Sequence, residues 1–478
     1  MTDKQLIDGQ WVDALSGGTW DVIDPATEDV VRTVPFGDDS DCRAAIEAAE
    51  RAFPAWSAMP AHDRGKILRR AAGILAERED ELVETTVRES GKPAVEARGE
   101  WRVAVELIEW LAEEGRRAYG RTIPSRAPSK RHLVLRHPIG VVGVITAWNF
   151  PAYNPIRSWA AALGAGCTVV GRASEYTPLT AMALAAAFDE AGLPPGVLNL
   201  VNGEPESMGR EMLRNPACRH ISFTGSVRVG RILMDGAGET FTRLSLELGG
   251  NAPVIVYPDA DLERLAKTAV PFRYRNCGQV CIAPQRYFLH ESIEQRFLDL
   301  AAEHVASLQV GSGLAATTNV GPLINRAQLE RVERIVDTSV DAGGRVLAGG
   351  KRPGDLERGY FFEPTLLAGV PSDAPAFQEE IFGPVLAATS FDDVDTVVAR
   401  ANATPYGLAA YVWTNDLSTA MRTAEGLEFG MVSVNEWAPH SVETPFLGWK
   451  QSGLGAESGK EGLDEYLETK LVTIGGLS

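Results

Sequence analysis

Hydrophobic residues recur at every third or fourth position through the first quarter of the chain, and this spacing is typical of amphipathic helices. It predicts three helices, over residues 40–57, 62–90 and 94–117. Gly120, Pro124 and Pro128 interrupt the pattern, and the apolar run at 133–135 has the length of a short strand. We therefore expect a helical N-terminal region followed by an extended segment.

Between residues 139 and 256 the pattern changes to short apolar runs, rich in Val and Ile, that alternate with helical patterns. The expected strands are at residues 141–145, 168–170, 197–200, 220–223 and 254–256. The expected helices include residues 178–191 and 225–237. Such alternation predicts a doubly wound parallel sheet whose ligand binds beyond the carboxyl ends of the strands. A second alternating region covers roughly residues 261–445, so the predicted fold class is α/β.

Composition excludes several kinds of partner. A chain of 478 residues is too long for one hydrophobic core, so two or three domains are expected. The formal net charge of −18 argues against nucleic-acid and anionic-membrane partners, which favour a basic surface. Because the chain has no long apolar run and its first residues carry no signal or transit pattern, we expect a cytoplasmic protein that does not span a membrane.

Two reactive side chains stand out, the thiol of Cys281 and the carboxylate of Glu247. A thiolate is a strong nucleophile, and a carboxylate can activate water. Taken alone, however, a cysteine beside Gly278 and Gln279 fits a small packed residue at least as well. The five cysteines, an odd number spread along the chain, suggest neither a disulfide framework nor a metal site.

Several motifs, in a fixed order along the chain, resemble the signatures of the NAD(P)-dependent aldehyde dehydrogenase superfamily. They are WNFP at residues 148–151, FTGS at 223–226, ELGG at 247–250, NCGQVC at 276–281, EEIFGPV at 379–385 and PFLGWKQSG at 445–453. Chance agreement of so many ordered motifs is negligible. The chain is therefore identified as a member of this superfamily.

The resemblance implies doubly wound parallel sheets in a cofactor domain and a catalytic domain, together with a small β element for oligomerisation. The implied segments are residues 1–117 and 137–248 for the NAD-binding domain, 249–462 for the catalytic domain, and 118–136 with 463–478 for the oligomerisation hairpin and tail. Because members of the family are dimers or tetramers, we expect a homodimer or a homotetramer.

The resemblance also assigns three catalytic residues. Cys281 would attack the aldehyde, the side-chain amide of Asn149 would stabilise the resulting oxyanion, and Glu247 would activate water to hydrolyse the thioester. A turn cap for Asn149 and an ion pair for Glu247 are the structural alternatives. The family often has a lysine after the position of Arg157, where this chain has Ser158, so any role of that lysine must be absent or filled elsewhere.

Similarity to the family suggests NAD as the cofactor. The residues implied in binding it are Trp148, Arg172, Ser174, Glu175, Gly225, Ser226, Leu248, Glu380 and Phe382. A carboxylate at Glu175 would accept hydrogen bonds from the adenosine ribose and repel a 2′-phosphate, which favours NAD. Arg172 replaces the family's lysine and would tolerate that phosphate, so NADP stays possible.

The substrate is expected to be a small aldehyde that carries a distal carboxylate. Arg157, Arg275 and Ser441 resemble the carboxylate-binding residues of succinate-semialdehyde dehydrogenases. Ala456 and Leu447 depart from the family pattern. The CIAP segment at residues 281–284 also resembles dehydrogenases of 2-oxoglutarate semialdehyde, whose substrate likewise has a distal carboxylate.

Three alternatives stay open. One is a broad-specificity aldehyde dehydrogenase with Trp159, Trp437 and Trp449 near an apolar tunnel. Another is a catalytically silent structural or binding protein on the same scaffold, against which the intact catalytic residues argue. A CoA-acylating enzyme is disfavoured because Glu247 is present to direct water.

Overall fold

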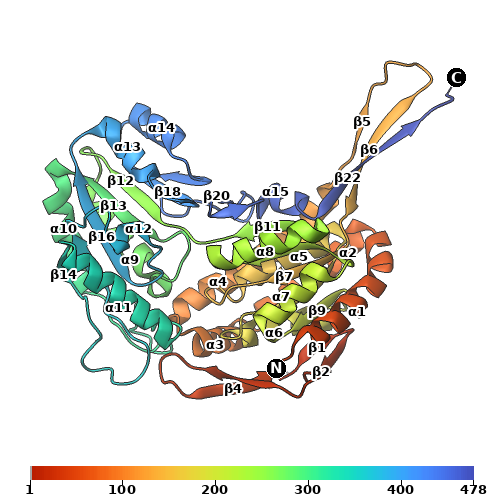
Figure 1. The fold of residues 1–478 in the computed structure, drawn as a ribbon, viewed down its shortest axis with the longest axis horizontal. Coiled ribbons are helices and arrows are strands. Elements are labelled where there is room, and N and C mark those ends of the chain that lie inside the picture. Colours follow the sequence, from red (N-terminus) through yellow and green to blue (C-terminus); the bar gives the residue numbers. More distant parts are fainter. Residues whose placement is uncertain (1–2, 478) are drawn as a thin grey trace.

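Two large sheets organise residues 3–477, the part of the chain that the computed structural model describes (Figure 1). The first has eight strands in the order β2-β1-β9-β8-β7-β10-β11-β21. Its strands are β1 (Gln5–Ile7), β2 (Gln10–Val12), β7 (Val141–Ile145), β8 (Thr168–Arg172), β9 (Leu198–Val201), β10 (Cys218–Thr224), β11 (Arg243–Glu247) and β21 (Gly453–Leu454). The five strands from β9 to β11 are parallel, and four of them, β7 to β10, are at predicted positions.

Helices cover both faces of this sheet. They are α1 (Asp39–Ala58), α2 (Ala61–Glu77), α3 (Glu79–Ser90), α4 (Ala94–Glu114), α5 (Tyr153–Ala165), α6 (Pro178–Glu190), α7 (Pro205–Arg214) and α8 (Val227–Thr240). In β7, Val142 and Val144 pack with the core formed by α2 to α6, whereas Val141 and Ile145 pack with α1, α7 and α8. Burial on both faces explains why these strands are continuous apolar runs in the sequence.

The predicted helix over residues 62–90 is two helices, α2 and α3. The backbone of Arg78 leaves the helical region (φ −107°, ψ 17°), and its N–H bonds to Leu75 at a helix end. Three acidic residues, Glu79, Asp80 and Glu81, follow at once. Negative charge favours a helix N-terminus, so this run supports a new helix rather than a continuous one.

The second sheet has seven strands in the order β14-β15-β16-β13-β12-β18-β19. These are β12 (Ala252–Val256), β13 (Pro284–His290), β14 (Arg345–Ala348), β15 (Thr365–Ala368), β16 (Val385–Phe391), β18 (Ala409–Trp413) and β19 (Met431–Val434). Its helices are α9 (Leu262–Tyr274), α10 (Glu291–Ala306), α11 (Arg326–Asp341), α12 (Pro375–Gln378), α13 (Val394–Asn402) and α14 (Leu417–Gly426).

The sequence pattern was wrong about where the first sheet ends. The run at 254–256 is part of β12 in the second sheet, whereas β11, which the pattern missed, adds a strand to the first. Gly249 and Gly250 lie between the two strands. A Cβ at Gly250 would collide with the carbonyl oxygen of Cys281, so glycine lets the crossing chain pass directly beside the cysteine turn.

A narrow three-stranded sheet projects from the body of the molecule (Figure 1). It consists of β5 (Arg121–Ile123), β6 (Arg131–Pro138) and β22 (Leu467–Ile474), and β22 pairs with β6 over its whole length. The hairpin and tail expected for oligomerisation therefore lie together. The remaining short elements are β3 (Thr19–Ile23), β4 (Val30–Pro35), β17 (Tyr406–Gly407), β20 (Trp449–Lys450), α15 (Gly459–Asp464), and the 3₁₀ turns η1 (Gly115–Arg117) and η2 (Arg275–Gly278).

No helix among residues 3–477 combines the length and the apolar character that crossing a membrane requires.

A buried carboxylate joins α3 to α6. Glu89 is fully buried, and it accepts hydrogen bonds from the backbone N–H groups of Leu179 and Thr180, each at 2.8 Å. These N–H groups lie in the first turn of α6, where a helix has no partner of its own for them. Glu89 therefore serves as a tertiary cap for α6.

We expect Glu89→Ala to lower the free energy of unfolding by about 3 kcal/mol, because two buried N–H groups lose their acceptor. Glu84→Ala is the matched control, since Glu84 lies on the same helix and forms an exposed ion pair with Arg88. It should cost less than about 0.5 kcal/mol. Urea unfolding followed by circular dichroism measures both, and equal losses would contradict the capping role.

Candidate active site

The predicted site residues of the first sheet gather at one edge. Strands β8, β7, β10 and β11 are adjacent and parallel, so their carboxyl ends lie side by side. Arg172 ends β8, Asn149 follows β7, Gly225 follows β10 and Glu247 ends β11. The topology alone therefore brings four segments that are far apart in sequence to a single edge.

A tight turn presents Cys281 to this edge. Within η2, Asn276 and Cys277 both have left-handed backbones (φ 51° and 54°), and Gly278 continues with φ 69°. A Cβ at Gly278 would collide with the carbonyl oxygen of Gly383, so the turn needs glycine there. The chain then reverses into β13 and leaves Cys281 partly accessible, whereas Cys277 is buried.

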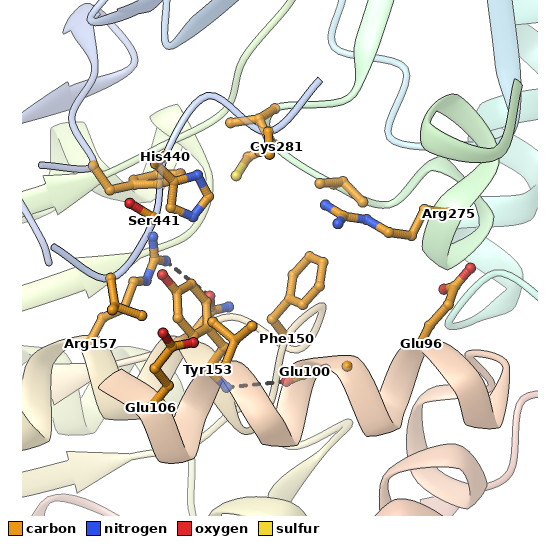
Figure 2. Close-up of a pocket in the computed structure, with 18 of the residues that line it drawn as sticks. Glu96, Glu100, Glu106, Phe150, Tyr153, Arg157, Arg275, Cys281, His440 and Ser441 are labelled. Carbon is orange, nitrogen blue, oxygen red and sulfur yellow. Dashed lines mark hydrogen bonds between the residues drawn. The ribbon is translucent and has the colours of Figure 1, made fainter. Parts of the chain in front are cut away.

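Two cavities meet at Cys281, which lines both. The first, of about 450 Å³, has walls from α4, α5, α9 and the segment at 438–446. Figure 2 shows Arg275 on one side of it, His440 and Ser441 on the other, and Cys281 between them. The second, of about 340 Å³, lies against the carboxyl ends of the first sheet and contains Asn149 and Glu247.

Glu247 shares one buried guanidinium with a second carboxylate. Arg157 Nη1 lies 2.9 Å from Glu457 Oε2, and its Nη2 lies 3.7 Å from Glu247 Oε2. All three side chains are at most 6% exposed. Burial alone would lower the pKa of Arg157, but Glu457 and Glu247 together raise it, so the guanidinium stays charged.

Because the better ion pair goes to Glu457, Glu247 is only partly compensated. Burial raises the pKa of Glu247 to about 8, Arg157 opposes this rise and the charge of Glu457 adds to it. Burial also raises the pKa of Glu457. A carboxyl group with a pKa near 8 exchanges its proton readily at neutral pH, which suits a general base.

The position where the family often has lysine is occupied by a polar cluster. Ser158 Oγ lies 2.8 Å from Ser222 Oγ and donates to Glu457 Oε1 at 3.4 Å. The cation that faces Glu457 is Arg157, one residue earlier. At this position the chain therefore has a serine that contacts Ser222 and Glu457, and the neighbouring Arg157 supplies the cation that pairs with Glu457.

Asn149 is held in place by a chain of side-chain hydrogen bonds. Its Oδ1 accepts from Asn154 Nδ2 at 3.0 Å, and Asn154 Oδ1 accepts from Arg157 at 2.9 Å. Its Nδ2 donates to the carbonyl oxygen of Gln279 at 3.2 Å, two residues before Cys281. The amide therefore lies on the second cavity's wall beside the cysteine turn, which is consistent with a polarising donor but also with a structural one.

Six of the nine predicted cofactor residues line the second cavity: Trp148, Gly225, Ser226, Leu248, Glu380 and Phe382. Trp148 and Phe382 meet edge to face with ring centroids 5.4 Å apart. Ser226 caps the N-terminus of α8, since its Oγ accepts a hydrogen bond from the backbone N–H of Val229. The first backbone N–H groups of this helix therefore lie at this wall of the cavity. Such a helix start accommodates a phosphate group.

Glu380 supplies the carboxylate of this cavity. Its Oε1 accepts the backbone N–H of Gly250 at 3.1 Å, and burial raises its pKa to about 7. A Cβ at Gly249 would collide with the Glu380 carboxylate, so the glycine leaves room for that side chain. A buried carboxylate with hydrogen-bonding capacity left over fits the hydroxyl groups of a ribose.

The other three predicted cofactor residues lie beyond this cavity, at the end of β8. Arg172 Nη2 is 2.7 Å from Glu175 Oε2 and 2.8 Å from the carbonyl oxygen of Gly203. Ser174 lies between these two residues in the sequence. Its side chain is buried, and its Oγ accepts a hydrogen bond from the backbone N–H of Tyr176. The guanidinium of Arg172 is thus already bound within the protein.

The three predicted substrate residues all line the first cavity, but they differ in what else they bind. Arg157 is engaged by Glu247, Glu457 and Asn154. The guanidinium of Arg275 makes no hydrogen bond or ion pair with any residue between 3 and 477, and lies over the rings of Phe272 (4.8 Å) and Phe150 (5.7 Å). Arg275 is therefore the uncommitted cation of this cavity.

The tryptophans considered for an apolar tunnel lie elsewhere. Trp159 is in the core of the first sheet, Trp449 is half exposed, and Trp437 is buried against Tyr411 and Trp413. Trp437 influences the cavity only indirectly, since its ring stacks on Phe272, which lines it.

Sequence reasoning missed Glu457, Tyr153 and His440. Glu457 had no signal beyond a lone acid after Ala456, and its partner Arg157 lies 300 positions earlier. Tyr153 and His440 line the first cavity, and their rings lie 6.3 Å apart. A polar aromatic beside WNFP and a histidine next to Ser441 were the available hints.

Comparisons with known proteins agree with this geometry. A sequence model of the aldehyde dehydrogenase family matches residues 11–472. A succinate-semialdehyde dehydrogenase (NADP(+)) of Escherichia coli is 43% identical over 473 residues, which cover 99% of this chain and 98% of the relative. A glutarate-semialdehyde dehydrogenase of Pseudomonas putida is 43% identical, covering 98% and 97%. The crystal structure of succinate-semialdehyde dehydrogenase from Burkholderia pseudomallei is 42% identical, with a TM-score of 0.98 over 99% and 98% of the two chains.

Accessibility makes Cys281 the expected site of alkylation. Of the five cysteines, all within residues 3–477, the other four are buried. Burial and then the neighbouring Glu247 raise the pKa of the Cys281 thiol. We expect iodoacetamide to modify Cys281 alone in the native protein, at a rate that increases with pH.

In Glu247→Gln the same increase should occur about one pH unit lower, because a neighbouring negative charge is removed. Peptide mass spectrometry locates the label, and Cys281→Ser is the control. Identical rate–pH profiles for the wild type and Glu247→Gln would show that the two side chains do not interact.

Proposed function

The chain belongs to the aldehyde dehydrogenase family, and from this membership we propose that it oxidises a small semialdehyde with a distal anionic group. The observation that carries the proposal is Arg275, a guanidinium without a protein partner in a cavity that ends at Cys281. Arg275 is partly buried, and although the charge of Glu96 lies near enough to interact with it, no carboxylate of residues 3–477 forms an ion pair with its guanidinium, so a substrate carboxylate would supply that partner. The names of the semialdehyde dehydrogenases among the relatives support the same substrate class.

We assign the first chemical step to Cys281. Its thiolate adds to the aldehyde carbon and leaves a thiohemiacetal whose oxyanion faces the cysteine turn. The amide of Asn149 and the backbone N–H of Cys281 are the assigned donors to that oxyanion. Loss of hydride from the thiohemiacetal carbon leaves a thioester on Cys281.

Glu247 is assigned to the second half of the reaction. It takes a proton from a water molecule that attacks the thioester carbon, the C–S bond breaks, and the carboxylate product leaves with the thiol restored. The partial pairing of Glu247 with Arg157 supports this role, because a fully paired carboxylate would be a weaker base. On the other side of Arg157, Glu457 forms a hydrogen-bonded cluster with Ser158 and Ser222.

The second cavity fits a nicotinamide dinucleotide. Gly225 and Ser226 would hold its pyrophosphate, Glu380 its nicotinamide ribose, and Trp148 and Phe382 the ring. When bound, this cofactor accepts the hydride. The relatives include an NADP(+) enzyme. Solved structures of a betaine aldehyde dehydrogenase that is 34% identical to this chain contain NAD. Because Arg172 already forms an ion pair with Glu175, we propose NAD as the preferred cofactor, with NADP possible.

We propose that the chain works as a homodimer or homotetramer through the projecting sheet. Exposed apolar side chains on this sheet support the proposal, namely Ile123, Leu135, Leu471 and Ile474. A narrow sheet of this kind has two unpaired edges and no core of its own, so a second copy would bury what it leaves exposed.

The apolar part of the cavity wall favours a second candidate, a broad-specificity aldehyde dehydrogenase. Phe150, Phe272, Val280, Ile282 and Phe446 would accept a neutral alkyl or aromatic chain. Turnover of a neutral aldehyde of equal length therefore serves as the internal comparison for the semialdehyde.

Arg275→Met keeps the packing on Phe150 and Phe272 but removes the charge. We expect it to lower kcat/KM for succinic semialdehyde about 10- to 100-fold, mostly through KM, because a hydrogen-bonded charge pair contributes roughly 1.5–3 kcal/mol. The value for butanal should change little. Arg102→Met, which removes an exposed arginine of α4 outside the cavity, is the matched control. A succinic semialdehyde KM that is no lower than that of butanal in the wild type would overturn the anion site.

The pH dependence tests the role of Glu247. Because burial raises its pKa to about 8, the carboxylate form is lost below that pH, and kcat for thioester hydrolysis should rise as pH passes through about 8. In Glu457→Gln, Arg157 has one carboxylate fewer and the like charge is gone, so the rise should move to lower pH by about one unit. Glu468→Gln, on the projecting sheet, is the control. A profile that does not move would show that Glu457 has no influence on the base.

A further inference from the structure

His440 is a polar side chain of the first cavity that the reaction described above does not use. It faces the space below Cys281 from the side opposite Arg275 (Figure 2). Its ring packs edge-on against Phe446, with centroids 4.7 Å apart, and lies tilted against Tyr153. Its imidazole makes no hydrogen bond with any residue between 3 and 477, and Nδ1 is fully buried.

The charges around His440 define what it can recognise. Burial, together with the guanidinium groups of Arg157 and Arg275, lowers the pKa of His440 to about 3. The imidazole is therefore neutral near pH 7, with one nitrogen that donates and one that accepts. A neutral imidazole is a poor partner for a second carboxylate but a good one for a hydroxyl group.

The geometry of the cavity says where that hydroxyl group would lie on the substrate. The aldehyde carbon is fixed at Cys281, and the distal anion extends toward Arg275. The carbon next to the aldehyde is tetrahedral, so a substituent on it points away from the chain that leads to Arg275. His440 lies on the side of the cavity opposite Arg275, so it is placed to meet such a substituent.

We propose that His440 recognises a hydroxyl group on the carbon next to the aldehyde, so that the preferred substrate is a 2-hydroxyaldehyde with a distal anion. This inference rests on the proposed function, because it needs the anion at Arg275 to orient the substrate. Sites built to hydrogen-bond a hydroxyl group discriminate against analogues that lack it, since their own polar atoms are then left unpaired.

Three substrates of equal chain length test the proposal: succinic semialdehyde, 3-hydroxy-4-oxobutanoate and 2-hydroxy-4-oxobutanoate. In the second the hydroxyl group is next to the aldehyde, and in the third it is next to the carboxylate. We expect kcat/KM for one enantiomer of the second to exceed that for succinic semialdehyde about tenfold, the effect of one net hydrogen bond. The third should show no such advantage.

The variants separate recognition from packing. His440→Phe keeps the ring contacts with Phe446 and Tyr153 but loses both nitrogens, so the ratio between the hydroxylated and plain substrates should fall to about one. His440→Asn keeps a donor and an acceptor and should retain part of the ratio. Val103→Ala, which trims an apolar side chain of the same cavity, should leave the ratio at the wild-type value.

The outcomes distinguish this inference from the proposed function. A wild-type ratio at or below one, or a ratio that survives in His440→Phe, would overturn the role of His440 while leaving the anion site intact. If butanal is oxidised as well as all three acids, the proposed function itself fails. Should His440→Phe not fold, the wild-type comparison of the two hydroxy isomers still decides the question.

Discussion

The pairing of one buried guanidinium with two carboxylates constrains most of the site. Arg157 holds Glu457 closely and Glu247 loosely, and through Asn154 it also fixes Asn149. Removing the cation would leave two buried acids without compensation, which is strongly unfavourable. The proposed general base, the proposed amide donor and part of the first cavity's wall therefore depend on a single side chain of α5.

This arrangement also separates two roles that similarity alone assigned to one pair of residues. Both Arg157 and Arg275 line the substrate cavity, as expected. Arg157 lies between two carboxyl groups that share its guanidinium, whereas Arg275 lies over aromatic rings and forms no ion pair with residues 3–477, with Glu96 as a nearby carboxyl group. The physical difference lies in their partners, and it is the reason for proposing Arg275 as the main anchor of a substrate anion and Arg157 as the residue that positions Glu247.

Backbone geometry is the second constraint on the site. Glycines at 249, 250 and 278 allow β12, the cysteine turn and the EEIFGPV segment to pass within contact distance of one another. Consecutive left-handed residues at 276–278 point Cys281 toward the end of β11. The thiol therefore lies where two cavities meet, the one proposed for the substrate and the one proposed for the dinucleotide.

The sequence by itself determined the fold class and four of the five parallel strands of the first sheet, and it supplied the proposal for the reacting groups, because hydrophobic period and ordered motifs are local properties of the chain. It did not reveal that the run at 254–256 changes sheets or that helix 62–90 breaks at Arg78, since both depend on which surfaces are available for packing. The sequence also did not indicate that Glu457 and His440 lie at the site, or that Arg157 is already paired with carboxylates and is not a free cation. Those facts are contacts between residues hundreds of positions apart, and only the tertiary structure decides which charges share one guanidinium and which are left for a ligand.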